Sequence, residues 1–444
     1  MSPRRPGKHS IVFVAVTVLL DTIGFGLIVP VLPSLLVQLT GESVNRAAIY
    51  GGYLAFTYAA IQFICAPVLG SLSDRFGRRP VLLSAVGALG IDYIVMGLAP
   101  TFGWLFLGRA IAGIAGASFT PAYAYVADIS PRERRAQSFG IVSASFGIGF
   151  ILGPALGGLL GGLGTRAPFF AAAALSLLNF LYGWFVLPES LAPERRRRFD
   201  WKRANPLGML LQMRKHTLVG GLLAALFCWM LGHQVMPATW AYYTKFRYGW
   251  SEAMIGASLA LAGALMATSQ ATLLRKLVPR WGERRTALTG IAFATLGYLG
   301  YGTATAGWMM LAWLSTWLLG AMVMPSTNAL MSHRIPHDAQ GELQGAVASL
   351  FSLSSILGPP LMTQLFGRFS ASGAPLQVPG AAFFAAAALA GIAFCIYGIT
   401  TRRAVALTRE PDRAWTEAAE AAVVESTVGE AVAGETAAPE APGS

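Results

Sequence analysis

Three charged residues lie inside long apolar stretches of the sequence, where charge is otherwise scarce. Asp21 falls near the middle of the first apolar stretch, Asp92 lies well inside the third, and Arg109 lies within the fourth. Placing a charge in a bilayer costs at least ~2.5–3.5 kcal/mol, so such residues usually face a cavity or a partner. A carboxyl group held away from water can bind and release a proton near neutral pH. The three residues predict either proton-coupled chemistry inside a membrane or a static Asp–Arg pair that locks helices together.

The composition places these residues in a membrane protein. Of the 444 residues, 55% are hydrophobic and only 12% are charged, whereas about a quarter are charged in soluble domains. The three cysteines lie far apart inside apolar runs, without ligand or disulfide spacing. The formal net charge of +12 would suggest a nucleic-acid partner only if the chain were soluble.

About twelve stretches reach the roughly 20 predominantly apolar residues that a membrane helix needs. They predict an all-α integral membrane protein with twelve transmembrane helices and both chain ends on one side. The stretches lie near residues 11–39, 47–71, 81–99, 102–128, 137–162, 167–187, 217–244, 252–275, 286–305, 307–331, 343–368 and 378–400.

The arginines indicate which side the ends occupy. They gather in alternate loops, beginning before the first span, and the intervening loops hold few basic residues. Basic loops stay on the cytoplasmic side of a membrane. We therefore expect both termini to be cytoplasmic, and the net positive charge needs no nucleic acid to explain it.

The chain divides into two halves that echo one another. Residues 189–216, a linker rich in Arg and Pro, separate six spans in 1–188 from six in 217–400, and the low-complexity residues 401–444 predict a disordered cytoplasmic tail. Phe-Ile-Leu-Gly-Pro-Ala at 150–155 returns 205 residues later as Ser-Ile-Leu-Gly-Pro-Pro. At the same offset, Arg280-Trp-Gly-Glu-Arg284 answers Arg75-Phe-Gly-Arg-Arg79, with Pro279 in the place of Asp74. Two six-helix repeats suit a transporter with its site between the halves.

A compact charged segment, Gly70–Leu83, joins the second and third spans. Asp74 is followed directly by Arg75 and four residues later by Arg78, with Gly77 between the two arginines. Glycine lets backbones approach closely, and the acid and the arginines can bond one another or nearby helix ends. The simpler alternative is an ordinary short cytoplasmic loop, because such loops tend to be Gly- and Arg-rich.

Small residues mark the fourth and fifth spans. Glycines and alanines follow Arg109, and we expect them to bring Arg109 close to the first helix. The fifth span is denser in glycine and contains Gly153 and Pro154. Glycine alone indicates only tight packing, but with a proline it predicts a bent, closely packed helix that can hinge or seal.

These motifs resemble those of the major facilitator superfamily, in particular its twelve-helix drug:proton antiporters. Four further segments resemble the tetracycline efflux pumps of that group: Leu20–Pro33, Gln62–Val68, Ala124–Ile129 and Pro168–Leu175. The resemblance implies the major facilitator fold and proton-coupled efflux of tetracycline-like or other amphipathic drugs. It also implies a bacterial inner-membrane location and a monomer.

The resemblance further implies roles for individual residues. Asp21 and Asp92 would be the carboxylates needed for transport, and Arg109 would be tied to proton exchange. A cytoplasmic gate would contain the charged segment, an acid ending the fourth span and the Gly-Pro pair: Gly70, Asp74, Arg75, Gly77, Arg78, Asp128, Gly153 and Pro154. A substrate cavity between the halves would be lined by polar and bulky side chains: Gln62, His233, Gln234, Trp240 and Met266.

Two positions depart from the tetracycline pumps, which typically carry a His in helix eight and an acid in helix nine. The matching positions here are Met266 and Ala294. We interpret the second-half spans as free of acids, so proton coupling is expected to rest on Asp21 and Asp92. The departures favour an alternative, export of an endogenous metabolite or an unrelated antibiotic. A non-transporting membrane sensor is a third hypothesis, disfavoured because a scaffold needs no membrane charges.

The sequence predicts no enzyme. It contains neither a nucleotide-binding loop nor a metal-ligand cluster, so we expect no cofactor and no metal. The expected partners are a small amphipathic substrate, protons and the lipid bilayer.

Overall fold

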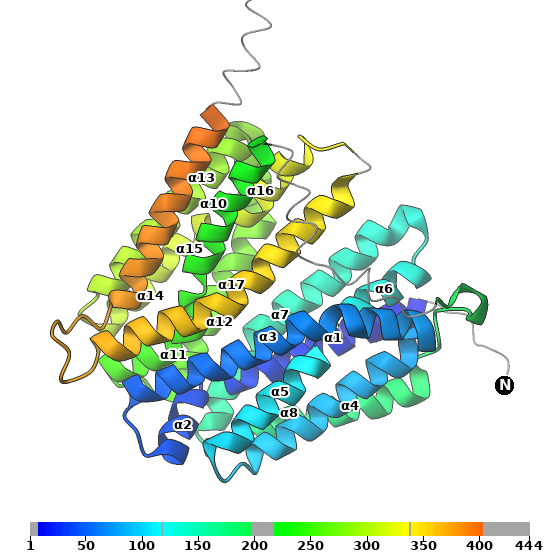
Figure 1. The fold of residues 1–444 in the computed structure, drawn as a ribbon, viewed down its shortest axis with the longest axis horizontal. Helices are drawn as coiled ribbons and strands as arrows, with labels where there is room; N and C mark the ends of the chain where they lie inside the picture. The colour runs from blue at the N-terminus through cyan, green and yellow to red at the C-terminus, as the bar shows by residue number, and fades with distance from the viewer. Residues whose placement is uncertain (1–7, 117–118, 198–216, 337–338, 403–444) are drawn as a thin grey trace, which may run out of the picture.

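The computed structural model describes residues 8–116, 119–197, 217–336 and 339–402, which contain helices and no strand (Figure 1). The first half comprises α1 (Lys8–Ile28), α2 (Leu32–Thr40), α3 (Val44–Phe76), α4 (Arg78–Gly97), α5 (Phe102–Gly116), α6 (Phe119–Ile129), η1 (Arg132–Arg134), α7 (Arg135–Gly161), α8 (Ala167–Val186) and η2 (Pro193–Arg195). The second comprises α10 (Thr217–His233), α11 (Val235–Tyr248), α12 (Glu252–Thr268), the π-helical η4 (Ser269–Leu273), α13 (Leu274–Thr303), α14 (Gly307–Trp313), η5 (Leu314–Thr316), α15 (Trp317–Gly320), α16 (Val323–Ser332), α17 (Gln340–Phe369) and a last helix, Ala381–Arg402. Residues 198–216 of the predicted linker and 403–444 of the predicted tail lie outside the described residues.

Twelve crossings of a membrane follow from the lengths of these helices. In the described residues, eleven helical segments are long and apolar enough to cross a bilayer. One of them, Glu252–Thr303, has 52 residues, more than twice the roughly 20 that one crossing needs. Its backbone leaves the helical region at Gly282 (φ 74°, ψ 161°), so two helices meet there. The predicted twelve-helix membrane architecture is confirmed.

The repeat in the sequence extends to the backbone. Gly77 and Gly282, 205 residues apart, both combine a positive φ with an extended ψ: 107° and 158° for Gly77, 74° and 161° for Gly282. The first span breaks between α1 and α2, around Val29, and the seventh breaks between α10 and α11 at Gln234, again 205 residues later. The two halves are therefore built on one plan.

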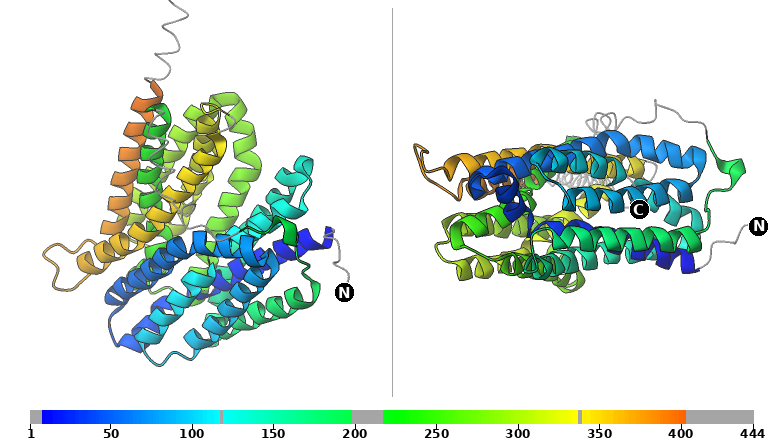
Figure 2. Two further views of the ribbon diagram at one scale, coloured as in Figure 1. Left: turned by 45° about the vertical axis from the view of Figure 1, so that its right-hand side comes forward. Right: turned by 90° about the horizontal axis from the view of Figure 1, so that it is seen from below.

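The two halves meet at one end of the molecule. We call the end that carries Gly77 and Gly282 the basic end, and the end that carries the α2–α3 and α11–α12 turns the opposite end. Near the opposite end the backbones nearly touch, since a Cβ added at Gly256 would lie 2.2 Å from the carbonyl oxygen of Pro154. Toward the basic end of α7, a Cβ at Gly147 would have no atom within 4 Å. The halves diverge toward the basic end, as the left-hand view also shows (Figure 2).

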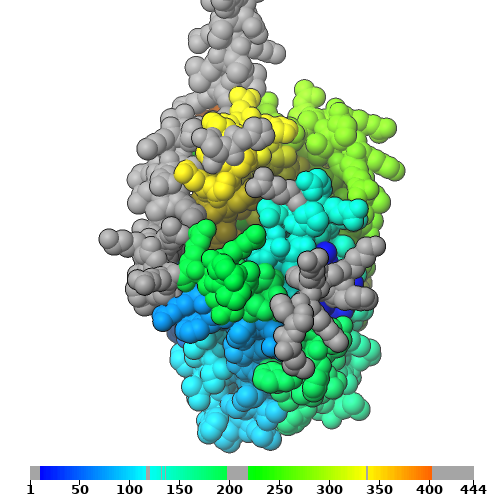
Figure 3. Space-filling view, turned by 90° about the vertical axis from the view of Figure 1, so that its right-hand side faces the viewer, coloured from blue at the N-terminus to red at the C-terminus, as the bar shows by residue number. Residues whose placement is uncertain are grey.

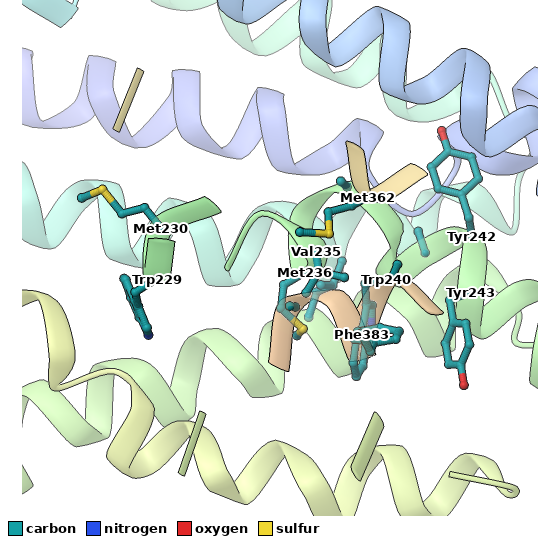
Figure 4. Close-up of a cluster of buried hydrophobic side chains, with 14 of the residues drawn as sticks. Trp229, Met230, Val235, Met236, Trp240, Tyr242, Tyr243, Met362 and Phe383 are labelled. Atoms are coloured by element: carbon teal, nitrogen blue, oxygen red, sulfur yellow. The ribbon is translucent and has the colours of Figure 1, made fainter. Parts of the chain in front are cut away.

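The hydrophobic core reflects this arrangement. One cluster of buried side chains runs through both halves, and a second is confined to the basic end of the first half, around Phe13, Leu82 and Val126. In the second half, neighbouring tyrosines point in opposite directions (Figure 4). Tyr242 reaches α3, where its hydroxyl lies against Gly51, whereas the Tyr243 hydroxyl donates to the carbonyl of Tyr301 at 3.0 Å. The interface between the two halves, which we call the seam, is thus continuous with the hydrophobic core only near the opposite end.

Candidate functional site

Two of the three predicted membrane charges form a buried ion pair. Asp92 on α4 and Arg109 on α5 approach to 3.7 Å (Oδ2 to Nη2), with side chains 0% and 10% exposed. A glycine makes the approach possible, because a Cβ at Gly108 would lie 2.8 Å from Asp92 Oδ1. The guanidinium also donates to the Met96 sulfur at 2.9 Å. The fourth span therefore places the Arg109 guanidinium beside the Asp92 carboxylate inside the helix bundle.

The third predicted charge, Asp21 on α1, lies in the same neighbourhood. Two tyrosines, Tyr58 on α3 and Tyr93 on α4, are within electrostatic range of Asp21, Asp92 and Arg109 alike. The Tyr93 hydroxyl lies 3.2 Å from where a Cβ of Gly24 would be, one turn after Asp21. Asp21 Oδ1 is buried without a hydrogen-bond partner among the described residues. The site thus combines a paired and an unpaired carboxyl.

The small residues of α5 pack against α3 and α4. Gly113 lies against the backbone of Tyr58, and Gly116 against the Tyr58 hydroxyl and Gln62. In the described residues, α5 packs chiefly on α3 and α4, and the expected closeness of Arg109 to the first helix stays a prediction. Gln62, predicted to line the cavity, donates to Tyr58 (3.2 Å) and to the carbonyl of Gly116 (3.0 Å). It is therefore tied to the charged cluster through Tyr58.

Arg78 is the centre of the predicted gate at the basic end. Its guanidinium contacts Asp74 at 2.6 Å, Asp128 of α6 at 3.1 Å and the Ser73 hydroxyl at 2.5 Å. The Ser73 hydroxyl in turn donates to the carbonyl of Gly70 at 2.9 Å. The gate residues that these contacts bring together all belong to the first half.

Arg75 does not join this cluster. Its side chain is exposed and lies over the Phe76 ring, 5.1 Å from the centroid. Arg75 lies within the last turn of α3, before the break at Gly77. Asp74 lies near the end of one helix and Arg78 begins the next, so the turn at Gly77 brings these two side chains together, and Arg75 points elsewhere.

Glu189, which the sequence analysis overlooked, closes the cluster from the start of the linker. Its carboxylate accepts hydrogen bonds from the backbone N–H groups of Arg78 (2.8 Å) and Arg79 (3.3 Å) at the beginning of α4. A Cβ at Gly77 would lie 2.3 Å from this carboxylate, so the position needs glycine for space as well as for its φ of 107°. Figure 3 views this end, with the segment after α8 in green beside the blue end of α3. The only sequence signal was an acid directly after the sixth span.

Gly153 and Pro154 lie in the part of α7 that runs toward the opposite end. A Cβ at Gly153 would lie 2.8 Å from the Cα of Gly26 on α1. On its other side, the carbonyl of Pro154 meets Gly256 of α12. The close packing expected of this segment is present, and its role as a hinge stays a prediction.

The second half supplies an aromatic cluster around His233. The imidazole stacks on Trp229 (centroids 5.2 Å apart, planes 10° apart) and meets Trp317 at 4.8 Å, and its Nδ1 is 3.3 Å from the Tyr298 hydroxyl. Gln234, at the break in the seventh span, donates to the Ser355 hydroxyl of α17 at 2.9 Å. No described contact joins these side chains to Gln62 across the seam.

Trp240 is buried within its own half, unlike the cavity lining that we predicted, whereas the place of Met266 in that lining stays a prediction. Trp240 is only 1% exposed, and its indole donates to Ser258 at 2.9 Å within the second half. It offers no surface to a ligand in this conformation. Met266 is half-buried on α12. Ala294, at the other departing position, lines a small cavity with mostly aromatic neighbours: Trp229, Tyr298, Tyr301, Thr316, Trp317 and Gly320.

The second-half spans are not free of acids, contrary to our expectation. Glu252 is the first residue of α12 and lies at the seam, where its carboxylate accepts hydrogen bonds from Lys245 (2.9 Å) and from Ser34 of the first half. Its position at the end of an apolar run concealed it in the sequence.

The sequence model of the Major Facilitator Superfamily matches residues 14–359 and, in a second match, 276–428. The chain belongs to the Major Facilitator Superfamily. It is 42% identical to the tetracycline resistance protein, class C, of Escherichia coli, over 85% of this chain and 95% of that protein. It is 40% identical to the class G protein of Vibrio anguillarum, over 81% of this chain and 91% of that protein.

The fold of this superfamily member is also found among solved structures. A bacterial homologue of the human lysosomal transporter Spinster, in an inward-facing and occupied conformation, aligns with a TM-score of 0.74 at 16% identity, over 89% of this chain and 96% of that one. At this identity the likeness concerns the fold alone. The predicted family and fold are confirmed.

Proposed function

We propose that this protein exports a small amphipathic drug, tetracycline-like or of another type, in exchange for protons. The likeness to tetracycline resistance proteins over most of both chains carries the proposal. The distribution of arginines supports a bacterial inner-membrane orientation with both termini and the basic end cytoplasmic. The described conformation is then open to the cytoplasm. The protein acts as a monomer and as a transporter rather than an enzyme.

The proton is exchanged at Asp21 and Asp92, and Arg109 is the cation that responds to their charge. A buried carboxylate is stabilised by its cationic partner, and adding a proton to it weakens that attraction. A proton on Asp92 would therefore release Arg109 toward Tyr58, over whose ring it already lies (5.9 Å). Each proton that enters contributes about 2.3 kcal/mol per 100 mV of membrane potential.

The substrate binds between the halves, where Gln62, His233, Gln234 and Met266 offer polar and flexible contacts. Support comes from the break at Gln234, because interrupted helices in membranes occur where the backbone lines a cavity or is held by protein. Trp240 forms the wall behind this surface. Alternating access follows from the repeat, with the halves closing at the basic end and opening at the opposite end.

A second candidate is export of an endogenous metabolite or an unrelated antibiotic. Ala294 favours it, because this position lies in a largely aromatic cavity where tetracycline pumps carry an acid. Resistance and uptake measured with tetracyclines, chloramphenicol-like compounds and fluoroquinolones would separate the two. We expect a tetracycline to be exported; a response to another class alone would favour the second candidate. A protein that moves none of them in proteoliposomes would support the sensor hypothesis.

A further inference from the structure

Side-chain hydrogen bonds join the two halves near the opposite end. Asn45 Nδ2 donates to the carbonyl of Gly367 at 3.4 Å, and Gln364 Nε2 donates to the Tyr53 hydroxyl at 2.9 Å. Both are bonds between neutral groups. The bond from Ser34 to Glu252 differs, because its acceptor is a carboxylate. Hydrogen bonds to a charged group are roughly twice as strong as neutral ones.

Glu252 is enclosed by elements of the first half. Ser34 of α2 contacts its carboxylate, and a Cβ at Gly161 of α7 would lie 2.9 Å from its Cβ. One turn earlier on α7, a Cβ at Gly158 would lie 2.5 Å from the Glu252 carbonyl oxygen. The side chain is only 20% exposed. The acid is therefore packed into the seam rather than displayed beside it.

The partners of Glu252 fall on two sides of that seam. Lys245 belongs to the second half, as Glu252 does, and their ion pair would survive a separation of the halves. Ser34, Gly158 and Gly161 belong to the first half, and these contacts exist only while the opposite end is closed. A contact made in one of two conformations shifts the equilibrium toward that conformation.

From this arrangement we propose that Glu252 is a positioning residue that pins the opposite end closed and sets how often the protein faces outward. The proposal rests on the proposed alternating access. Ser34 supplies the bond across the seam, and Lys245 holds the carboxylate in place to receive it. The two glycines of α7 leave the room for Glu252 to enter.

The test measures the distance across the opposite end in the full-length protein. Spin labels at Leu163 and Leu376, which are 80% and 62% exposed and lie on different halves, would be introduced after replacing Cys65, Cys228 and Cys395. Pulsed electron-spin distance measurements in nanodiscs then report the ratio of separated to closed molecules. We expect Glu252→Gln to raise this ratio severalfold, because the Ser34 hydroxyl then donates to a neutral amide oxygen in place of a carboxylate. Ser34→Ala should shift it in the same direction.

Glu42→Gln is the matched control. Glu42 is also an acid at the opposite end, but its partner is Arg46, one turn away on the same half (3.0 Å). It should leave the distances unchanged. An unchanged ratio in Glu252→Gln would overturn the proposal. So would a shift in Lys245→Gln without one in Ser34→Ala, because the effect would then arise within the second half.

Flux separates this proposal from the proposed function. If the parent protein moves substrate in proteoliposomes but Glu252→Gln leaves the distances unchanged, only the proposed role of Glu252 is wrong. If the distances shift as expected while the parent moves no substrate, Glu252 does stabilise the closed opposite end and the assignment as an exporter is wrong.

Discussion

The turn at Gly77 and its counterpart at Gly282 share a backbone but not a charge pattern. Both glycines take a positive φ, and both turns place an arginine against the last helix of their own half. Arg79 donates to the carbonyl of Trp184 at 2.6 Å, and Arg284 donates to the Thr401 hydroxyl at 2.8 Å. This hydrogen bond occurs in both halves because each half holds its third membrane helix against its sixth.

The charges between those anchors differ. In the first half, Arg78 is 10% exposed and bonds two acids, Asp74 and Asp128. At the equivalent positions, 205 residues later, Glu283 faces His333 at 3.6 Å, and the imidazole side chain is 68% exposed. The acid and its partner have exchanged places, the imidazole of the pair is exposed, and Pro279 replaces Asp74. We infer that the turn is structural in both halves. The cluster of Arg78 with Asp74 and Asp128, which we call the latch, belongs to the first half alone.

Removal of the Asp74 carboxylate should give the largest difference in export between the two halves. We expect Asp74→Ala to insert and fold but to lose export, because Arg78 keeps Asp128 and Ser73 as partners while the latch is gone. Pro279→Ala, at the same place in the second half, should transport as the parent does. Uptake into everted vesicles and the amount of inserted protein measure both effects. Normal export by Asp74→Ala, or its failure to insert, would contradict the latch.

The two glycines should respond unequally to an added methyl group. Gly77→Ala combines a strained φ with displacement of Glu189 from two backbone N–H groups, and we expect a loss of about 3 kcal/mol. Gly282→Ala meets no atom within 4 Å, so only the strain of about 1–2 kcal/mol remains. Thermal unfolding in detergent should show the larger fall in Tm for Gly77→Ala. Equal falls would mean that Glu189 contributes nothing.

A charge exchange in the second half should have the smallest effect. Glu283→Arg combined with His333→Asp gives the second half the polarity of the first, and solvated pairs contribute at most about 1 kcal/mol. We therefore expect the double variant to match the parent in Tm and in export. A gain or loss of export would show that the second-half pair also takes part in the latch.

The sequence predicted what depends on local pattern. Span lengths follow directly from helix geometry, and the short distance in sequence between Asp74 and Arg78 indicated that their charges could meet. Glu189 and Glu252 escaped because their partners lie 111 and 218 residues away. Trp240 was expected at a cavity because spacing along a span does not distinguish a residue that faces the seam from one buried within its own half. Only the packing of α11 against its neighbours shows which of its faces is directed to the seam and which is buried within the second half.

The most direct test of the account is substrate-dependent proton release from everted vesicles that contain Asp21→Asn. Glu42→Gln serves as the control, since it removes an acid that lies outside the charged cluster. We predict that the control releases protons on addition of a transported drug and that Asp21→Asn, inserted at the same level, does not. Proton release by Asp21→Asn equal to that of the parent would contradict the assignment of proton exchange to this cluster.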